Sequence, residues 1–265
     1  MKADLDILIL GCGYTGQRVA KRFLARGARV TATTRNPPRL AGLGAEIIGT
    51  HELPKHVRPG MLALHSIPPD GPAGLLDPLR GMARRLVYLS STAVYGAASI
   101  VNETTPVDEG TERARTRLQV ERAIAAGPWS SLILRPAAIY GPGRGVQESI
   151  QRGEHSLSDK FVSRIHVDDL ASHVEAALLS AVTGAYPVAD LEPCTSRDIA
   201  EFCARLLKVP VTGAGQGPAA RMPRFANNRR VDGSAIRQAL GVKLTYPSYR
   251  VGIPAALSGA TTPAC

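Results

Sequence analysis

The stretch that decides the fold is LDILILGCGYTG, from Leu5 to Gly16. It begins with a short apolar run that ends at Leu10, as expected of a strand buried on both faces of a sheet. The pattern Gly-x-Gly-x-x-Gly follows, and residues 17–26 then place apolar side chains at helical spacing. A glycine loop between a strand and a helix predicts the first βαβ unit of a dinucleotide-binding domain.

Each glycine of this loop has its own physical role. Gly11 permits a tight turn, Gly13 lets the main chain approach a pyrophosphate, and Gly16 lets the helix pack closely on the strand. The free N–H groups at the helix N-terminus attract the same phosphates. We therefore expect a dinucleotide to bind at Gly11, Gly13, Tyr14, Thr15 and Gly16. A glycine-rich turn without a ligand is the alternative.

The end of the second predicted strand, in ARVTATTR (residues 28–35), indicates which dinucleotide binds. An acidic residue there would bind the ribose 2′-hydroxyl of NAD. Here Thr33 and Thr34 are followed by Arg35, so no carboxylate is present. An arginine suits the 2′-phosphate of NADP, and Thr34 or Arg39 would assist it. We expect NADP(H), with NAD the weaker ligand, unless Arg35 is only a solvated surface residue.

Strand and helix patterns alternate along the residues that follow. Further strands are expected within 45–49, 61–67, 85–96 and 130–143, a short helix in 74–83, and a longer one over Thr111–Ala126. This alternation predicts an α/β fold with a Rossmann-type, doubly wound parallel sheet. We expect residues 1–144 to form this core, with a strand and helix around 161–190 returning to it. Residues 145–265 are expected to form mainly a small C-terminal α/β subdomain on the substrate side.

Capping residues mark helix starts in the second half of the chain. Asp168 and Asp169 fit an N-cap and a first-turn position, and Thr195 or Ser196 fits the start of another helix. The two aspartates have no His or Cys partner at metal-ligand spacing, so we expect no metal site. The segment 209–230 is rich in Gly, Pro and Arg and is expected to be a loop.

Composition limits the class of protein. The 265 residues are 44% apolar, enough to bury one large α/β domain, and the net charge is +10. That charge favours anionic partners, but no long Lys/Arg run is present, so nucleic acid is not the expected partner. Four cysteines without a CxxC pair indicate neither zinc nor disulfides, and no apolar segment is long enough for a membrane span. We expect a cytoplasmic protein.

Five segments together resemble one family. They are GCGYTG, YLSSTAVYG, LRPAAIYGPG, RIHVDDLA and the long stretch that begins NNRRVDGSAI, in that order along nearly the whole chain. This set is similar to the extended short-chain dehydrogenase/reductases, also called the NAD-dependent epimerase/dehydratase family. HSIPP, residues 65–69, resembles an atypical bacterial subgroup of it. The resemblance implies a Rossmann domain, an NAD(P) cofactor, and a small carbonyl or nucleotide-sugar substrate.

The resemblance also implies positions for residues of the site. Ser91 stands four residues before Tyr95 of the VYG segment, where the family polarises a substrate carbonyl with a hydroxyl. The alternative is that this hydroxyl only caps the end of a strand. His65, Ser66 and Pro136 would lie beside the cofactor.

The family's Tyr-x-x-x-Lys pair is missing from this chain. The Glu that follows that Tyr by eight residues matches Glu121, so the Tyr and Lys positions hold Arg113 and Arg117. A Tyr beside a Lys can give or take a proton, whereas a guanidinium stays charged and has no acceptor. Arg117 would bind ribose hydroxyls, and Arg113 a substrate carboxylate or phosphate. Alternatively, Arg113, Arg117 and Glu121 form a salt-bridge ladder on a solvated helix face.

Catalysis would then need another acid. Tyr95, Tyr140 and His166 are candidates, and Tyr140 follows a strand at the edge where open α/β sheets bind ligands. A basic segment in the C-terminal region would bind a substrate phosphate or form a solvated loop. Its arginines are Arg221, Arg224, Arg229 and Arg230.

These observations predict an NADP(H)-binding oxidoreductase or epimerase/dehydratase-like protein that acts on a small anionic molecule. The candidate catalytic residues are Ser91, Arg113, Arg117 and Tyr140. The alternative is a non-catalytic NAD(P)-binding or sensing protein that has lost the Tyr-Lys pair. A homodimer through the helix that carries Arg117 is an analogy with the family only.

Overall fold

The computed structural model describes residues 5–69, 74–155, 157–210 and 228–259. Within these ranges, seven strands form one sheet in the order β11-β7-β5-β4-β1-β2-β3, and every neighbouring pair is parallel. The strands are β1 (Asp6–Leu10), β2 (Arg29–Thr33), β3 (Glu46–Ile48), β4 (Met61–His65), β5 (Ala83–Leu89), β7 (Ser130–Pro136) and β11 (Gly184–Val188). The order reverses between β1 and β4, which places a ligand crevice at the carboxyl ends of these two strands.

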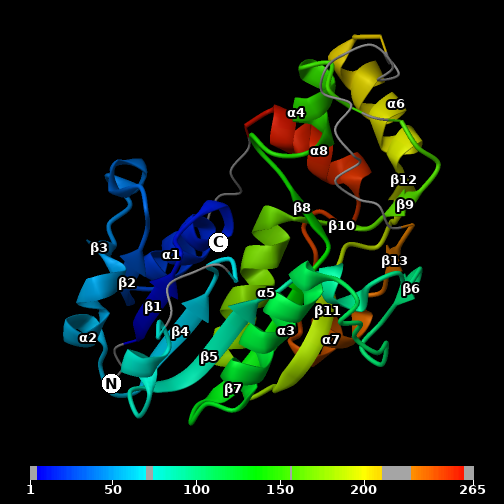
Figure 1. Cartoon of the computed structure of the whole chain (residues 1–265). Coiled ribbons are helices and arrows are strands. Elements are labelled where there is room, and N and C mark those ends of the chain that lie inside the picture. Colours follow the sequence, from blue (N-terminus) through cyan, green and yellow to red (C-terminus); the bar gives the residue numbers. More distant parts are fainter. Residues whose placement is uncertain (1–4, 70–73, 156, 211–227, 260–265) are drawn as a thin grey trace.

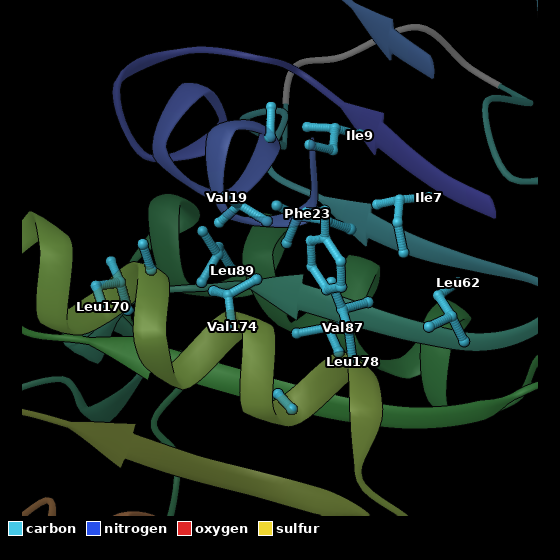
Figure 2. Packing of buried hydrophobic residues seen from close by; sticks show 14 of the residues in the cluster. Ile7, Ile9, Val19, Phe23, Leu62, Val87, Leu89, Leu170, Val174 and Leu178 are labelled. Atoms are coloured by element: carbon cyan, nitrogen blue, oxygen red, sulfur yellow. The ribbon is translucent and has the colours of Figure 1, made fainter. Parts of the chain in front are cut away.

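Helices cover both faces of the sheet (Figure 1). On one face, α1 (Tyr14–Ala25) packs against α5 (Val167–Leu179), and their apolar side chains meet those of the central strands. Figure 2 shows Phe23 of α1 beside Leu178 of α5, above Val87 of β5. On the other face, α3 (Glu112–Ala125) contributes Ile124 to a second apolar cluster. The predicted doubly wound Rossmann-type sheet is confirmed.

Two crossover connections contain no long helix among the described residues. Between β3 and β4 the chain forms only η2 (Thr50–Glu52) and α2 (Leu53–His56). Between β4 and β5 the described residues contain only η3 (Asp77–Leu79), where we expected a short α-helix. Pro78 is the second residue of this turn, and Gly81 follows its C-cap with a φ of +73°, so no further helical turn follows.

Two helix starts differ from the sequence-based expectation. Helix α1 begins at Tyr14, directly after the glycine loop, rather than at Gln17. Helix α5 has His166 as its N-cap, because the His166 ring accepts a hydrogen bond from the N–H of Asp168. The assignment of Asp168 as the N-cap was therefore wrong, and both aspartates lie in the first turn, where they favour the helix dipole.

The remaining elements form a smaller unit beside the sheet, called the small subdomain below (Figure 1). Its strands pair as β8 (Ala138–Tyr140) with β10 (Arg164–His166), and β9 (Phe161–Val162) with β12 (Cys194–Thr195). Its helices α4 (Val146–Gln151), α6 (Ser196–Leu207) and α8 (Tyr249–Leu257) enclose a small apolar cluster. The N-cap of α6 is Thr195, which forms a capping box with Asp198.

Part of the second half of the chain lies against the main sheet. Strand β13 (Arg230–Val231) pairs with β6 (Ile100–Val101), and α7 (Ser234–Ala239) packs beside β11.

Residues 211–227 of the expected loop lie outside the described residues, and Arg230 is in a strand. The chain division at residue 144 stays a prediction. No helix in the described ranges is long and apolar enough to cross a membrane.

Candidate cofactor and substrate site

The glycine loop is fixed to the end of β2. The N–H of Gly11 donates to Thr33 Oγ1 at 3.0 Å, and the N–H of Cys12 donates to the Thr33 carbonyl at 2.7 Å. Gly11 has a φ of +83°, and a Cβ there would lie 2.7 Å from Ile67 Cγ1. Only glycine suits this position, since both the backbone angle and the space exclude a side chain.

Gly13 and Gly16 differ in what surrounds them. Among the described residues, no atom lies within 4 Å of the place where a Cβ on Gly13 would stand. A Cβ on Gly16 would lie 3.1 Å from the Gly11 carbonyl oxygen and 3.2 Å from Ile9 Cγ2, because α1 packs closely on β1. The first turn of α1 leaves N–H groups without acceptors, and Gly13 offers no side chain to cap them. The loop is therefore an open main-chain cradle suited to an anion.

The Tyr14 side chain connects this loop to the loop after β8. Its hydroxyl donates to the Pro142 carbonyl at 3.0 Å, and the Arg18 and Arg144 guanidinium groups lie over its ring. Burial raises the pKa of Tyr14 to about 12. A cofactor contact from Tyr14 would come from its main-chain N–H, because the phenol is already used. Thr15 is buried beneath the cradle.

The region after β2 contains cations without carboxylate partners. Thr33 is buried and bound to Gly11, and Thr34 Oγ1 accepts the N–H of Asn36 at 3.1 Å. Arg35 and Arg39 are exposed, and neither forms an ion pair within the described ranges. The next carboxylate along the chain, Glu46, accepts a hydrogen bond from Thr31 and is 3.1 Å from His56. Both arginines are thus free to meet an anion.

His65 and Ser66 lie at the carboxyl end of β4, beside β1. The Ser66 N–H donates to the Leu10 carbonyl at 2.8 Å, which keeps the two strand ends together. His65 is 5% exposed, and its ring meets that of Tyr88 edge to face at 5.0 Å. Burial lowers the pKa of His65 to about 4, so the imidazole is neutral near pH 7. Its Nδ1 has no hydrogen-bond partner among the described residues.

Ser91 begins a short turn after β5. It is the N-cap of η4 (Thr92–Tyr95), and its Oγ accepts the N–H of Ala93 at 3.1 Å. Ser91 is half-buried. The hydroxyl therefore caps the start of a turn rather than the end of a strand, and its O–H still has the capacity to donate to a ligand.

Glu121 does not belong to a solvated ladder on α3. It is 4% exposed and accepts two hydrogen bonds from the Arg135 guanidinium, at 3.1 and 2.6 Å. Ser90 donates to it as well, at 2.5 Å. Arg135 also donates to the Tyr95 hydroxyl at 3.2 Å, which places Tyr95 in this buried network rather than at an open site. The alternative interpretation, a salt-bridge ladder of Arg113, Arg117 and Glu121 on a solvated helix face, was therefore wrong.

Arg113 and Arg117 lie on α3, the helix that packs against η4. Arg113 is exposed and Arg117 is half-buried, and neither forms an ion pair among the described residues. Arg117 lies beside Tyr88, and burial lowers the pKa of its guanidinium, which the neighbouring charge of Arg113 lowers further. Its Nε is buried without a hydrogen-bond partner. The helix that packs against the Ser91 turn thus carries two cations that form no ion pair among the described residues.

Tyr140 and His166 are in the interior of the small subdomain. The Tyr140 side chain is buried, and its hydroxyl donates to the Ser248 carbonyl at 3.2 Å. The His166 ring contacts those of Tyr140 and Tyr246, and burial lowers the pKa of His166 to about 4. The structure therefore does not bring Tyr140 together with Ser91, and we do not carry it forward as the proton donor. Pro136 is buried at the end of β7.

Sequence reasoning missed the place of Arg229. It was expected to bind a substrate phosphate or to lie in a solvated loop, yet it is 7% exposed and donates to carbonyls of the η4 turn. Arg230 is exposed, and its guanidinium lies 3.5 Å from the centre of the Phe161 ring. Arg221 and Arg224 lie outside the described residues. No sequence signal separates Arg229 from its neighbours, because its burial depends on the distant 92–98 turn.

This fold and this loop define a Rossmann-type protein of the dinucleotide-binding class. Residues 70–216 match the model of the NAD dependent epimerase/dehydratase family, and the chain belongs to that family. The resemblance inferred from sequence motifs is thus confirmed.

Three similar proteins extend this comparison. A Silicibacter pomeroyi protein of unknown function is 32% identical, with 97% of this chain and 99% of that one covered and a TM-score of 0.82. A Methylobacillus flagellatus protein, provisionally described as an NAD-dependent epimerase/dehydratase, is 27% identical with a TM-score of 0.80 over 97% and 99% of the two chains. A 3-diazoavenalumate denitrifying reductase of Streptomyces is 26% identical over 94% of this chain and 99% of its own. These findings support an oxidoreductase or epimerase-like function with a nicotinamide dinucleotide.

Proposed function

We propose that the protein is an NADP(H)-dependent reductase of small anionic molecules, in which two arginines replace the family's Tyr-Lys pair. The observation that carries this proposal is the position of Arg113 and Arg117. Both guanidinium groups lack an ion pair among the described residues, and both lie on the helix that packs against the Ser91 turn. A site with two such cations favours an anionic ligand.

The residues present fit an NADP(H) molecule. The open cradle at Gly13 would hold the pyrophosphate through main-chain N–H groups, and a side chain there would fill it. Arg35, with Arg39 nearby in sequence, would bind the 2′-phosphate, since no carboxylate follows β2 to select NAD. When bound, the nicotinamide ring supplies a hydride. Further cofactor contacts are proposed for Tyr14, Thr15, Thr34, His65, Ser66, Arg117 and Pro136.

The residues around the site favour a substrate that accepts hydride without needing a proton from the protein. A guanidinium does not act as an acid near neutral pH, and the hydroxyls of Tyr95 and Tyr140 are buried and hydrogen-bonded. We therefore propose a substrate whose reacting group is positively charged, such as a diazonium. When hydride forms the new C–H bond, the C–N electron pair leaves with N₂, so R–N₂⁺ becomes R–H without any proton transfer.

The Streptomyces relative supports this choice. Its name describes a reductase that removes nitrogen from a diazo compound, and the name of its substrate is that of an anion. In this chain, Arg113 in the first turn of α3 would bind such a carboxylate, and Ser91 would hydrogen-bond the substrate near the reacting group. An epimerase or dehydratase reaction is less well supported, because it needs the proton transfer that a Tyr provides.

The test is reduction of matched substrates by the purified protein with NADPH. An aromatic diazonium that carries a carboxylate should be reduced, with NADPH consumption and the R–H product measured by mass spectrometry. Its carboxylate methyl ester should react more weakly, and Arg113→Ala should raise KM for the acid about tenfold or more, the value of one charged hydrogen bond. Arg115→Ala, on an exposed position of the same helix, is the control. Equal KM values in Arg113→Ala and Arg115→Ala would contradict the proposal.

A second candidate is a non-catalytic NAD(P)-binding or sensing protein. The observation that favours it is the burial of Tyr95 and Tyr140, the two tyrosines considered as candidate acids. Tight NADPH binding without turnover of the diazonium, ketone and nucleotide-sugar members of a substrate panel would support this candidate instead.

A further inference from the structure

A buried arginine from the second half of the chain holds the turn that carries Ser91. Arg229 Nε donates to the Ala98 carbonyl at 3.0 Å, and its two terminal nitrogens donate to the carbonyls of Thr92 and Gly96. One guanidinium thus joins three carbonyl groups within the segment that follows Ser91. This matches the rigid, planar fork of donors that only Arg provides.

Arg229 is itself fixed by the small subdomain. Its main-chain N–H donates to the Phe161 carbonyl at 2.8 Å, and it forms a parallel bridge with Val162 of β9. The next residues, Arg230 and Val231, form β13. Arg229 is thus bridged to β9 by its main chain, while its side chain reaches the turn that follows β5 of the main sheet.

The charge of Arg229 is not paired with a carboxylate among the described residues. It is 7% exposed, and burial lowers the pKa of its guanidinium. A buried cation without a counter-charge is expensive, and carbonyl dipoles offset only part of that cost. The burial of the Arg229 charge therefore needs an explanation beyond packing. The hydrogen bonds from Arg229 to the turn after Ser91 supply one.

We infer that Arg229 is a positioning residue for Ser91. It fixes the Thr92–Ala98 segment, and so the direction of the Ser91 hydroxyl, which caps the first residues of that segment at 3.1 Å from the Ala93 N–H. It also places a buried positive charge against the carbonyl of Thr92, the residue next to Ser91. The inference rests on the proposed role of Ser91 in substrate binding, but its test does not require a substrate.

The test uses a thiol in place of the Ser91 hydroxyl as a probe of that position. Ser91→Cys is made in a protein with Cys265→Ser, and the introduced thiol is alkylated with iodoacetamide over a range of pH. The other cysteines are buried, namely Cys12, Cys194 and Cys203. The midpoint of the rate profile reports the thiol pKa, which is about 8.5 for a free cysteine and falls beside a fixed positive charge. The profile is then repeated with Arg229→Met and Arg229→Lys.

We expect the Arg229 protein to show a midpoint below that of a free cysteine. Arg229→Met should raise the midpoint by about half to one pH unit, which slows alkylation below the midpoint roughly three- to tenfold. NADPH affinity, measured by calorimetry on the same samples, should change less than twofold. An unchanged midpoint with intact NADPH binding would overturn the inference.

The lysine variant covers the case in which Arg229→Met does not fold. Lys keeps the charge but replaces the fork with a single ammonium, so the midpoint should lie between those of the arginine protein and a free cysteine. A midpoint equal to that of the arginine protein would show that the fork does not position residue 91. A shifted midpoint in a protein that reduces no substrate would instead contradict the proposed function and leave the positioning role standing.

Discussion

Glu121 of α3 and Arg135 of β7 form a two-point ion pair inside the protein, with Glu121 Oε2 2.6 Å from Arg135 Nη2 and Oε1 3.1 Å from Nε. Their side chains are only 5% and 10% exposed. The pair ties the helix that carries Arg113 and Arg117 to the sheet. Each buried charge is stabilised by the other, because too little water reaches either side chain to solvate it alone.

Removal of one member of this pair should destabilise the fold strongly. Glu121→Ala is expected to lower the free energy of unfolding by about 3–5 kcal/mol, since Arg135 would remain buried and unpaired. The double variant Glu121→Leu with Arg135→Met should recover most of this loss. Glu154→Ala, which breaks an exposed pair with Arg152, is the control and should change little. Urea unfolding measures all three, and equal effects at the two sites would contradict the prediction.

A side chain at Gly13 should block the cofactor without harm to the fold. The φ of Gly13 is negative, at −91°, and nothing described lies within 4 Å of its Cβ position. Gly13→Val should therefore keep its thermal midpoint within a few degrees while calorimetry detects no NADPH or NADH binding. Gly16→Val should instead lower the thermal midpoint, because its Cβ meets Ile9 and the Gly11 carbonyl. Cofactor binding by a folded Gly13→Val protein would refute the assignment of the loop.

Arg35 should decide the preference between the two dinucleotides. Loss of one charged contact to a 2′-phosphate corresponds to about 1.5–3 kcal/mol, or roughly ten- to 150-fold in the NADPH dissociation constant. Arg35→Ala should therefore weaken NADPH binding by that factor and leave NADH binding nearly unchanged. Titration of both cofactors into the same protein supplies an internal control. A variant that weakens both equally would show that Arg35 supports the loop rather than reads the phosphate.

Asp190 should make the protein less stable as the pH rises. Burial raises its pKa to about 8, far above the value of about 3.9 in an unfolded chain. Between these values the folded state holds one more proton than the unfolded state, so stability falls by up to about 1.4 kcal/mol per pH unit. Three buried histidines with pKa values of about 4 act in the opposite direction, but only below pH about 6.5: His65, His166 and His173.

The window from pH 6.5 to 8 therefore avoids the contribution of these histidines and suits a test of Asp190. Asp190→Asn should be more stable than the parent protein there, and the difference should grow with pH. Urea unfolding at three pH values in this window measures it. A difference that stays constant with pH would mean that Asp190 ionises as easily in the folded protein as in the unfolded chain.

The glycine loop could be predicted from the sequence because its causes are local. The apolar run, the glycine spacing and the helix start all lie within Leu5–Gly16, and each constrains the main chain directly. The start of α5 was placed less well, since a histidine ring replaced an aspartate as the cap. Both side chains can accept the same N–H, and propensity alone favours Asp over His.

The interior polar contacts could not be predicted, since their partners are far apart in the sequence. Glu121 has the spacing of a surface residue on α3, and only the approach of β7 makes it a buried ion pair. Tyr140 ends strand β8, where a site residue is expected, but the start of α8 covers it and its hydroxyl donates to the N-cap residue Ser248. Arg229 reaches a turn more than a hundred positions away, and helical or strand periodicity carries no information about such a contact.

The packing of α1 against α5 has a consequence for how the chain acquires its structure during synthesis. Arg22 of α1 meets Glu175 of α5 at 2.5 Å, and Phe23 is buried against the same helix. The first βαβ unit therefore leaves the ribosome long before the helix that shields its apolar face. A nascent chain that ends before α5 leaves Val19 and Phe23 without the helix that covers them in the finished fold. For the same reason, residues 1–144 expressed alone should aggregate.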